Sequence, residues 1–94
     1  MRQFAFARSF SRSLKGLSPK EKIAIQGHID AFMLAMDAGQ IPPGFGLKKL
    51  AGNLWEIRSD LATRILFHWK QESLTFLFVG NHNEVQRFLR YYLS

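Results

Sequence analysis

The spacing of hydrophobic residues changes near the middle of this chain. Up to about residue 37 they recur every three or four positions, as on one face of an α-helix, whereas beyond residue 53 they largely alternate with polar residues, as in a half-buried strand. The stretch between includes "AGQIPPGFG", whose two prolines and three glycines interrupt regular structure. The pattern therefore predicts helices followed by a sheet.

Two helices are predicted after a short edge strand in "RQFAFA". The first helix covers "RSFSRSLKGL", in which Ser9 is placed to cap the start. The second runs from Pro19 to about Asp37. It begins with a capping-box pattern formed by Ser18 and Glu21. Its buried stripe at helical spacing comprises Ile25, Ile29, Phe32 and Met36. The two segments are interpreted as a helical hairpin.

Three strands are predicted in the second half of the chain. "LWEIRS" and "ATRILFHWK" alternate, so that one face of each strand is apolar. "SLTFLFV" is apolar on both faces, which is typical of a strand near the centre of a sheet. Turns of only a few residues join the strands and predict an antiparallel meander. A last helix follows in "NEVQRFLRYYL", with Asn83 as its candidate cap.

The predicted fold is α+β, with a helical hairpin packed on one face of a small antiparallel sheet in the order β-α-α-β-β-β-α, in a single domain over residues 1–94. The face expected to pack on the helices comprises Trp55, Ile57, Ile65, Phe67 and Trp69. The opposite face is expected to be exposed or covered by a partner, and it carries Glu56, Arg58, Arg64 and His68. His82 follows the last strand and would overlook this polar face.

Composition restricts the chemistry that the domain can perform. Hydrophobic residues make up 47% of the chain and charged residues 21%, which supports a folded interior. The absence of cysteine excludes disulfides, thiolate zinc sites and a cysteine nucleophile. The three histidines lack the spacing of metal ligands, so neither a metal nor a cofactor is expected. The sequence shows no signal peptide and no run long enough to span a membrane, and a cytoplasmic protein is expected.

The net charge of +6 is distributed unevenly. Residues 1–22 hold six Lys or Arg against one Glu, and residues 44–94 hold seven against four acidic residues. Such a field favours a polyanion or an acidic protein as partner. Composition alone does not distinguish a nucleic-acid-binding surface from a solvated basic face.

Two stretches resemble the RelE/ParE superfamily of toxins from bacterial type II toxin–antitoxin systems. "GLKKLAGNLWEIRSDLATRILF" is similar to the family's passage in which a basic linker leads into a strand ending in arginine and then a hairpin with a second arginine. "FLFVGNHNEVQRFLR" is similar to the Gly-x-His ending of the RNA-cleaving, RelE/YafQ-like branch. The resemblance covers almost the whole chain. It implies a toxin that cuts mRNA in the ribosomal A site without a metal and is blocked by a cognate antitoxin.

The resemblance, together with the chemistry of metal-free RNA cleavage, gives candidate catalytic residues. The ribose 2′-OH attacks its own 3′-phosphate, which requires proton transfer and cations around the developing charge. His82 aligns with the family's functional residue and is suited to proton transfer near neutral pH, the alternative being a polar turn residue. Arg64 matches the hairpin arginine and would hold the scissile phosphate, the alternative being a solvent-facing strand residue. Arg58 would give electrostatic support or pair with Asp60.

Further basic residues are candidates for binding mRNA or the ribosome. Lys48 and Lys49 are expected in a loop before the sheet, where they would contact phosphates without sequence preference. Arg87 lies about one helical turn after the histidine motif, and His68 shares the polar strand face. The chain also departs from the family, because Glu56 occupies a position where the best-known branch has a lysine.

Two other functions are compatible with the sequence. A ParE-like toxin that poisons DNA gyrase shares the fold but needs no histidine, so the role of His82 distinguishes it from a ribonuclease. A basic RNA-binding module without toxicity would leave bacterial growth unchanged when its gene is induced.

Overall fold

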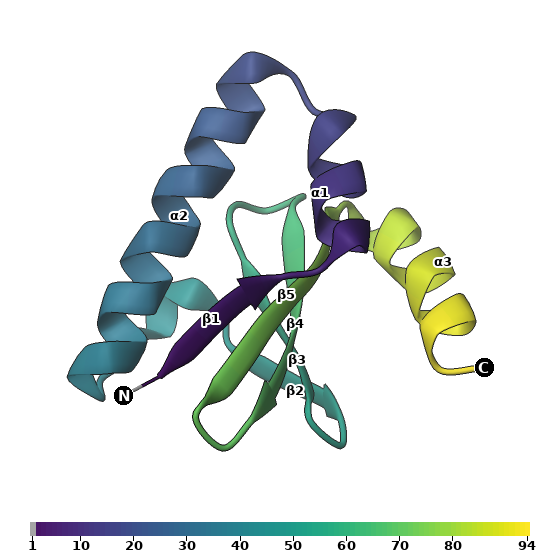
Figure 1. Ribbon diagram of the computed structural model, residues 1–94. Helices are drawn as coiled ribbons and strands as arrows, with labels where there is room; N and C mark the ends of the chain where they lie inside the picture. Colours follow the sequence, from purple (N-terminus) through teal and green to yellow (C-terminus); the bar gives the residue numbers. More distant parts are fainter. Residues whose placement is uncertain (1) are drawn as a thin grey trace.

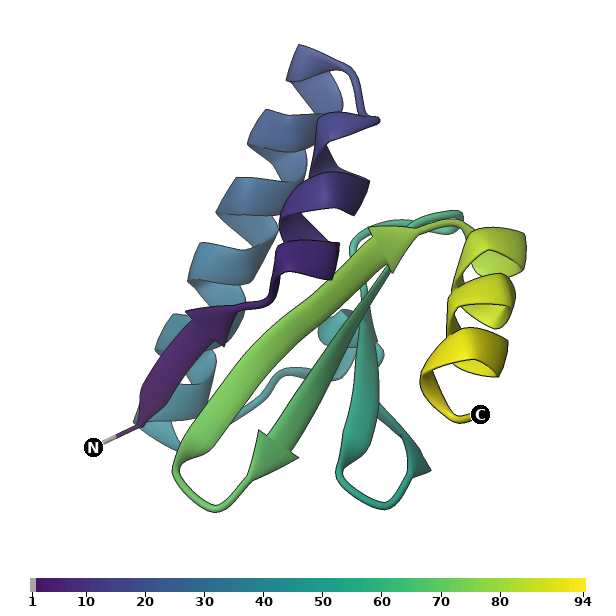
Figure 2. The ribbon, with the colours of Figure 1, turned by 45° about the vertical axis from the view of Figure 1, so that its right-hand side comes forward.

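A five-stranded sheet lies between two helical layers (Figure 1). The computed structural model describes residues 2–94. In chain order the elements are β1 (Gln3–Phe6), α1 (Arg8–Lys15), α2 (Pro19–Ala38), the 3-10 turn η1 (Pro43–Phe45), β2 (Lys48–Ala51), β3 (Leu54–Arg58), β4 (Arg64–Lys70), β5 (Ser73–Gly80) and α3 (His82–Tyr92). Figure 2 shows α1 and α2 on one side of the sheet and α3 on the other, so the predicted α+β class is confirmed with three layers.

The two N-terminal helices form as predicted. The Ser18 hydroxyl accepts the N–H of Glu21 at 3.2 Å, and the Glu21 carboxylate accepts the N–H of Ser18 at 3.0 Å, so the capping box starts α2. The prediction that Ser9 caps α1 is wrong, because Ser9 donates its hydroxyl to the carbonyl of Leu77 instead. The buried residues of α2 are Ile25, Ile29, Phe32 and Met36, as predicted. Within residues 2–94, no helix combines the length and the apolar character needed to cross a membrane.

The sheet has the strand order β1-β5-β4-β3-β2. β3, β4 and β5 form the predicted antiparallel meander, whereas β1 lies parallel to β5 at one edge. The other edge is β2, a strand that the hydrophobic pattern does not predict. Lys48 and Lys49 therefore lie in a strand and not in a loop. The four residues "KKLA" show no alternation, and backbone pairing with β3 makes them a strand.

One face of the sheet packs on α1 and α2 and forms the larger core. The predicted apolar face is confirmed, since this core contains or contacts Trp55, Ile57, Ile65, Phe67 and Trp69. Aromatic rings join the layers: the centroid of Phe32 in α2 lies 5.2 Å from that of Phe67, and the centroid of Phe10 in α1 lies 6.0 Å from that of Phe76. Each such pair contributes about 0.5–1.5 kcal/mol beyond the area that it buries.

The opposite face of the sheet is not the exposed polar surface that the sequence predicts. α3 covers it, and a second core forms from Leu54, Leu66, Leu77 and Val85. A β-bulge explains part of the difference: the pairing of β4 with β5 shifts after Leu66, so that Leu77 and Phe78 both join this face. Glu56, predicted on an exposed face, is only 3% exposed.

Candidate functional site

His82 is the first residue of α3 and follows β5 after one intervening residue. That residue, Asn81, caps the helix in place of the predicted Asn83. Its side chain accepts the N–H of Glu84 at 2.8 Å, and the Glu84 carboxylate accepts the N–H of Asn81 at 2.8 Å. His82 is exposed beside the positive end of the helix dipole. Because a helix N-terminus favours anions, the imidazole lies next to a position suited to phosphate.

Arg64 and His82 line the same open hollow of about 210 Å³. The other residues that line it are Leu61, Ala62, Asn81 and Asn83. The sheet register explains why the two meet, since Arg64 is directly opposite Gly80, two residues before His82. We refer to this space as the candidate hollow. It brings together the two leading catalytic candidates from the sequence.

Arg64 forms an ion pair with Glu56 on the neighbouring strand β3. Arg64 Nη1 lies 2.7 Å from Glu56 Oε2. The Arg64 side chain is 18% exposed and the Glu56 side chain 4% exposed, so water is largely excluded from the pair. Charges attract more strongly in such an environment than at an open surface. Arg64 is therefore anchored at one end and is not a freely solvated strand residue.

Arg58 lies in a different hollow, although it is directly opposite Arg64 in the register of β3 and β4. This second hollow has a volume of about 410 Å³ and is lined by Pro43, Gly44, Gly46, Arg58, Ser59, Asp60 and Leu61. A Cβ atom at Gly46 would lie 3.5 Å from the Cγ and Cδ atoms of Arg58, so the arginine stem passes close over this glycine. Leu61 lines both hollows and is 98% exposed, which places an apolar side chain between the two arginines' sites.

Asp60 shapes the turn between β3 and β4. Its carboxylate accepts the backbone N–H groups of Ala62 at 2.8 Å and Thr63 at 2.7 Å. These two hydrogen bonds lower the pKa of Asp60 from its ordinary value. Within residues 2–94 the structure contains no ion pair between Arg58 and Asp60, so the interpretation of Arg58 as a partner of Asp60 is not supported.

Lys48 and Lys49 are exposed on opposite faces of β2. Lys48 is directly opposite Glu56, and Lys49 is directly opposite Trp55. Because side chains alternate along a strand, Lys48 shares the α3 side of the sheet with the candidate hollow, and Lys49 shares the face of Trp55. The two lysines therefore do not form one patch.

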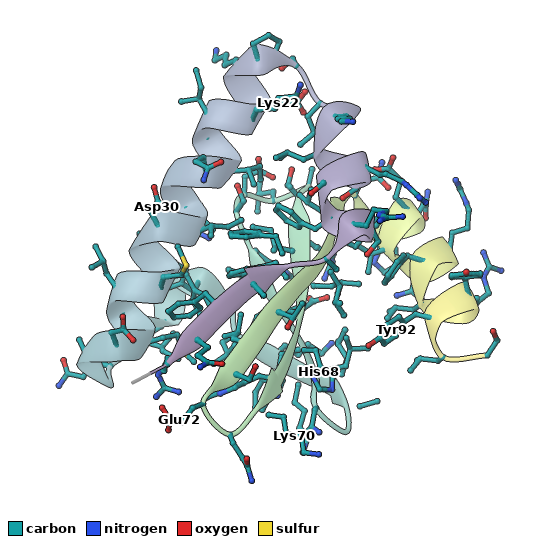
Figure 3. The ribbon with its side chains drawn as sticks, in the orientation of Figure 1. Lys22, Asp30, His68, Lys70, Glu72 and Tyr92 are labelled. Carbon is teal, nitrogen blue, oxygen red and sulfur yellow. The ribbon has the colours of Figure 1, made fainter. Side chains whose placement is uncertain are left out.

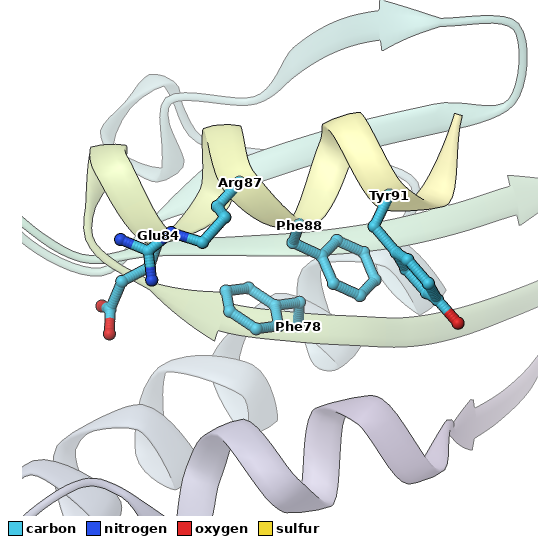
Figure 4. A pocket seen from close by; sticks show the side chains of 5 residues that line it. All are labelled: Phe78, Glu84, Arg87, Phe88 and Tyr91. Carbon is cyan, nitrogen blue, oxygen red and sulfur yellow. The ribbon is translucent and has the colours of Figure 1, made fainter. Parts of the chain in front are cut away.

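The last two candidates lie outside the candidate hollow. His68 is opposite Leu54 on β3 and Thr75 on β5, and Figure 3 shows it toward the end of the sheet where Glu72 lies. Arg87 belongs to a separate hollow of about 270 Å³, lined by Phe78, Glu84, Arg87, Phe88 and Tyr91 (Figure 4). The structure thus does not bring either residue to His82.

The candidate hollow combines three features that suit phosphate chemistry: a guanidinium group, an imidazole and a helix N-terminus. The first and third stabilise negative charge on a phosphate, and an imidazole is a side chain that general acid–base catalysis commonly uses. Within residues 2–94, no group of three or more His, Asp or Glu side chains is placed to hold a metal ion. The remaining histidine, His28, packs against the ring of Phe45 with 4.9 Å between centroids.

Sequence reasoning missed two contributors to this region. The first is the pairing of Glu56 with Arg64, for which the sequence does hold a signal: the two residues share a face on adjacent antiparallel strands, where opposite charges attract. The second is the exposure of Leu61 in the turn between the two hollows, for which a single sequence holds no signal.

Comparison with known proteins gives a match in fold only. No protein-family model and no curated protein matches the sequence. A mutant of YafQ from E. coli matches with a TM-score of 0.74 at 11% identity, covering 90% of this chain and 98% of that chain. A chain of the E. coli DinJ–YafQ toxin–antitoxin complex gives a TM-score of 0.73 at 13% identity, covering 89% and 96%. A chain of the RelB–RelE antitoxin–toxin complex from Methanococcus jannaschii gives a TM-score of 0.66 at 17% identity, covering 89% of this chain and 96% of that chain.

These matches extend over nearly the full length of both chains. At such low identities they establish the architecture and leave the chemistry to be argued from the residues. The resemblance inferred from the two sequence stretches is thereby confirmed at the level of structure. This chain has the fold of the RelE and YafQ toxins.

Proposed function

We propose that this chain is the toxin of a type II toxin–antitoxin system and acts as a ribosome-dependent mRNA endoribonuclease. The observation that carries the proposal is the candidate hollow, where Arg64 and His82 meet beside the N-terminus of α3. The fold shared with RelE and YafQ supports it. A gyrase-poisoning toxin needs no histidine here, so the position of His82 favours the ribonuclease.

The proposed reaction is a metal-free transesterification. The 2′-oxygen attacks the adjacent phosphorus, the bond from phosphorus to the 5′-oxygen of the next nucleotide breaks, and a 2′,3′-cyclic phosphate and a 5′-hydroxyl are formed. His82 is the general acid–base group for the protons that leave the 2′-OH and reach the 5′-oxygen. Arg64 binds the phosphate oxygens through its N–H groups, and Arg58 adds positive charge from the adjacent strand.

The remaining basic candidates are assigned to binding. Lys48, Lys49 and Arg87 are exposed, and together with His68 they would contact phosphates of mRNA or ribosomal RNA. The candidate hollow is open and has few groups that grip a nucleotide, so we assign alignment of the substrate to the ribosome.

A cognate antitoxin is the proposed protein partner. The net charge of +6 favours an acidic protein, which would associate rapidly through electrostatic attraction. The DinJ–YafQ and RelB–RelE structures are complexes of this kind, and they support the same assignment for this chain, which we place in the cytoplasm.

The test is induction of the wild-type chain, His82→Ala and Gln86→Ala in bacteria, with growth curves and primer-extension mapping of mRNA. Wild-type protein is expected to arrest growth and produce in-frame cuts. His82→Ala should lower cleavage by about 10²–10⁴-fold, because it removes the acid–base group. Gln86→Ala changes an exposed residue one turn further along the same helix and should behave as wild type.

Two results would contradict the proposal. Growth arrest without mRNA cleavage, equal in the wild type and His82→Ala, would favour a toxin that poisons DNA gyrase. Normal growth with all three proteins, expressed and folded, would leave a basic binding module as the better interpretation. If His82→Ala still cuts mRNA at the full rate, the ribonuclease function would stand, but His82 would be a polar turn residue and not the acid–base group.

A further inference from the structure

Glu56 places a carboxylate in a largely apolar part of the sheet. It is 3% exposed, and among residues 2–94 it is the one buried residue with a charged or polar side chain. It is directly opposite Leu66, and both Leu66 and the nearby Leu54 belong to the buried core beneath α3. Removing a carboxylate from water is strongly unfavourable unless a partner compensates it.

Among residues 2–94, that partner is Arg64. Arg64 is directly opposite Arg58, two residues along the strand from Glu56, so its side chain runs back over the sheet to place Nη1 2.7 Å from Oε2. Lys48 is directly opposite Glu56 on the other side but is exposed, and between these two described residues no ion pair forms. Glu56 therefore holds the one arginine that lines the candidate hollow.

Stability does not account for a carboxylate at this position. Well-packed apolar side chains of similar volume usually stabilise a fold at least as well as a buried ion pair. Residue 56 has leucines beside it, so a third leucine would extend the core under α3. The charge of Glu56 acts instead on Arg64, the residue with which it pairs.

The ion pair fixes the orientation of the guanidinium group. Arginine carries five N–H donors in one rigid plane. With Nη1 bound to Glu56 Oε2, one end of the guanidinium is held, and the other donors are left for a second acceptor. Arg64 is only 18% exposed and lines the candidate hollow together with His82, so this hollow is where a second acceptor would reach those donors.

We propose that Glu56 is a positioning residue that holds the Arg64 guanidinium in the orientation that binds the scissile phosphate. The inference rests on the ribonuclease function proposed above. Glu56 does not line the candidate hollow, so it acts on the substrate only through Arg64. Its charge also offsets like-charge repulsion between Arg58 and Arg64, which are directly opposite in register on adjacent strands although they line different hollows.

The test measures kcat and KM of purified full-length variants on ribosomes carrying a short mRNA. The variants are Glu56→Leu, Glu56→Gln, Arg64→Ala and the double variant Glu56→Leu/Arg64→Ala. Glu56→Leu should lower kcat by about 10- to 100-fold with little change in KM, because the phosphate is held in the wrong geometry. Glu56→Gln keeps an oxygen that accepts a hydrogen bond from Nη1, so its kcat should fall less than that of Glu56→Leu. In the Arg64→Ala background, Glu56→Leu should cause no further loss.

Asp37→Asn is the matched control, since it removes one negative charge from an exposed position on α2 and should keep wild-type kcat. Circular dichroism and thermal unfolding establish that each variant is folded. If Glu56→Leu does not fold, the same comparison of kcat is made with Glu56→Gln, in the wild-type chain and in the Arg64→Ala background. Wild-type kcat in Glu56→Leu, or an equal loss with and without Arg64, would overturn the positioning role.

Binding of uridine 3′-monophosphate, followed by NMR titration, separates this inference from the proposed function. A wild-type chain that cuts no RNA would contradict the ribonuclease proposal. A loss of affinity in Glu56→Leu that disappears in the Arg64→Ala background would still support the positioning role. Equal affinity of the wild type and Glu56→Leu would overturn it.

Discussion

At the scale of single residues, hydrogen bonds to carboxylates decide the shape of the region around the candidate hollow. Asp60 holds the turn between β3 and β4 by accepting two backbone N–H groups, and this lowers its pKa. Glu21 caps α2 in a similar way, and hydrogen bonds from Ser18 lower the pKa of Glu21. Both groups therefore link the fold to pH.

Asp60→Asn should change how stability depends on acid. Because the pKa of Asp60 is lower in the folded chain than in the unfolded chain, its charge stabilises the fold above the unfolded pKa of about 3.9, and this contribution is lost as the pH falls through the folded pKa. The free energy of unfolding of Asp60→Asn should thus fall less steeply than that of the wild type below about pH 5. Urea unfolding at a series of pH values measures it.

The control for this experiment is Asp37→Asn, which alters an exposed carboxylate on α2 and should keep the wild-type acid dependence. Glu21 leaves a residual dependence in both variants. An Asp60→Asn curve parallel to that of the wild type across the whole range would show that the turn does not depend on the charge of Asp60.

The sequence placed some site residues correctly for a clear reason. Arg64 begins a strand and His82 follows the neighbouring strand, so their meeting at one end of the sheet follows from antiparallel order alone. The burial of Glu56 does not follow, because strand alternation assigns a residue to a face and is silent on what covers that face. The separate hollow of Arg58 also depends on the course of the chain around Gly46, which alternation does not describe.

At the scale of elements, the junction of β5 with α3 leaves little room. A Cβ atom at Gly80 would lie 2.9 Å from the Phe78 ring, 3.0 Å from Glu84 Oε1 and 3.1 Å from Glu84 Cβ. Glu84 is fixed there by its hydrogen bond to Asn81. The glycine is therefore required by close approach of its neighbours, and its position two residues before His82 couples helix placement to the site.

Gly80→Ala and Gly27→Ala should have opposite effects on stability. Gly80→Ala should lower the free energy of unfolding by about 1–3 kcal/mol, as is usual for overpacking. Gly27 lies within α2, and a Cβ atom there would have no neighbour within 4 Å, so Gly27→Ala should raise the free energy of unfolding by about 0.5–1 kcal/mol. Chemical denaturation of both variants measures the two changes. A stable Gly80→Ala protein would mean that α3 shifts without cost.

At the starts of α2 and α3, the boundary was predictable where one capping-box pattern was available and failed where there were two. Ser18 and Glu21 stand alone before α2, and the helix begins there. Before α3, Asn81 with Glu84 and Asn83 with Gln86 both fit a capping box, and the structure uses the first. Propensity alone does not separate two such starts, because the choice also depends on which side of the helix must face the sheet.

At the scale of the whole molecule, basic residues are spread over several surfaces, and binding of RNA should depend on which of them are removed. Lys48→Ser and Lys49→Ser should each reduce the slope of log K against log salt for single-stranded RNA by about 0.7, if each lysine neutralises one phosphate. Lys22→Ser is the control, since Figure 3 shows Lys22 at the far end of α2 from the sheet. Fluorescence anisotropy at several salt concentrations gives the slopes. An equal effect of all three substitutions would indicate diffuse attraction without a defined path for the RNA.

The order and class of the elements were predictable because the spacing of hydrophobic residues changes once along the chain. The third layer was not, because a bulge at Leu77 breaks strand alternation and brings the consecutive residues Leu77 and Phe78 to the α3 side. The edge strand β2 was missed for the opposite reason: Lys48 and Lys49 carry no hydrophobic pattern, and only pairing with β3 makes them a strand.

The serines of α1 have a consequence for the solubility of this chain. Beyond the end of β1, the edge of β5 is closed by the Ser9 hydroxyl, which donates to the carbonyl of Leu77, and by the Ser13 hydroxyl, which accepts the N–H of Val79. β5 reads "SLTFLFVG", an apolar and uncharged segment of the kind that stacks into amyloid-like aggregates when its edge is free. Residues 3–15 thus protect the edge of β5. Removing them would expose an aggregation-prone strand without removing any candidate catalytic residue.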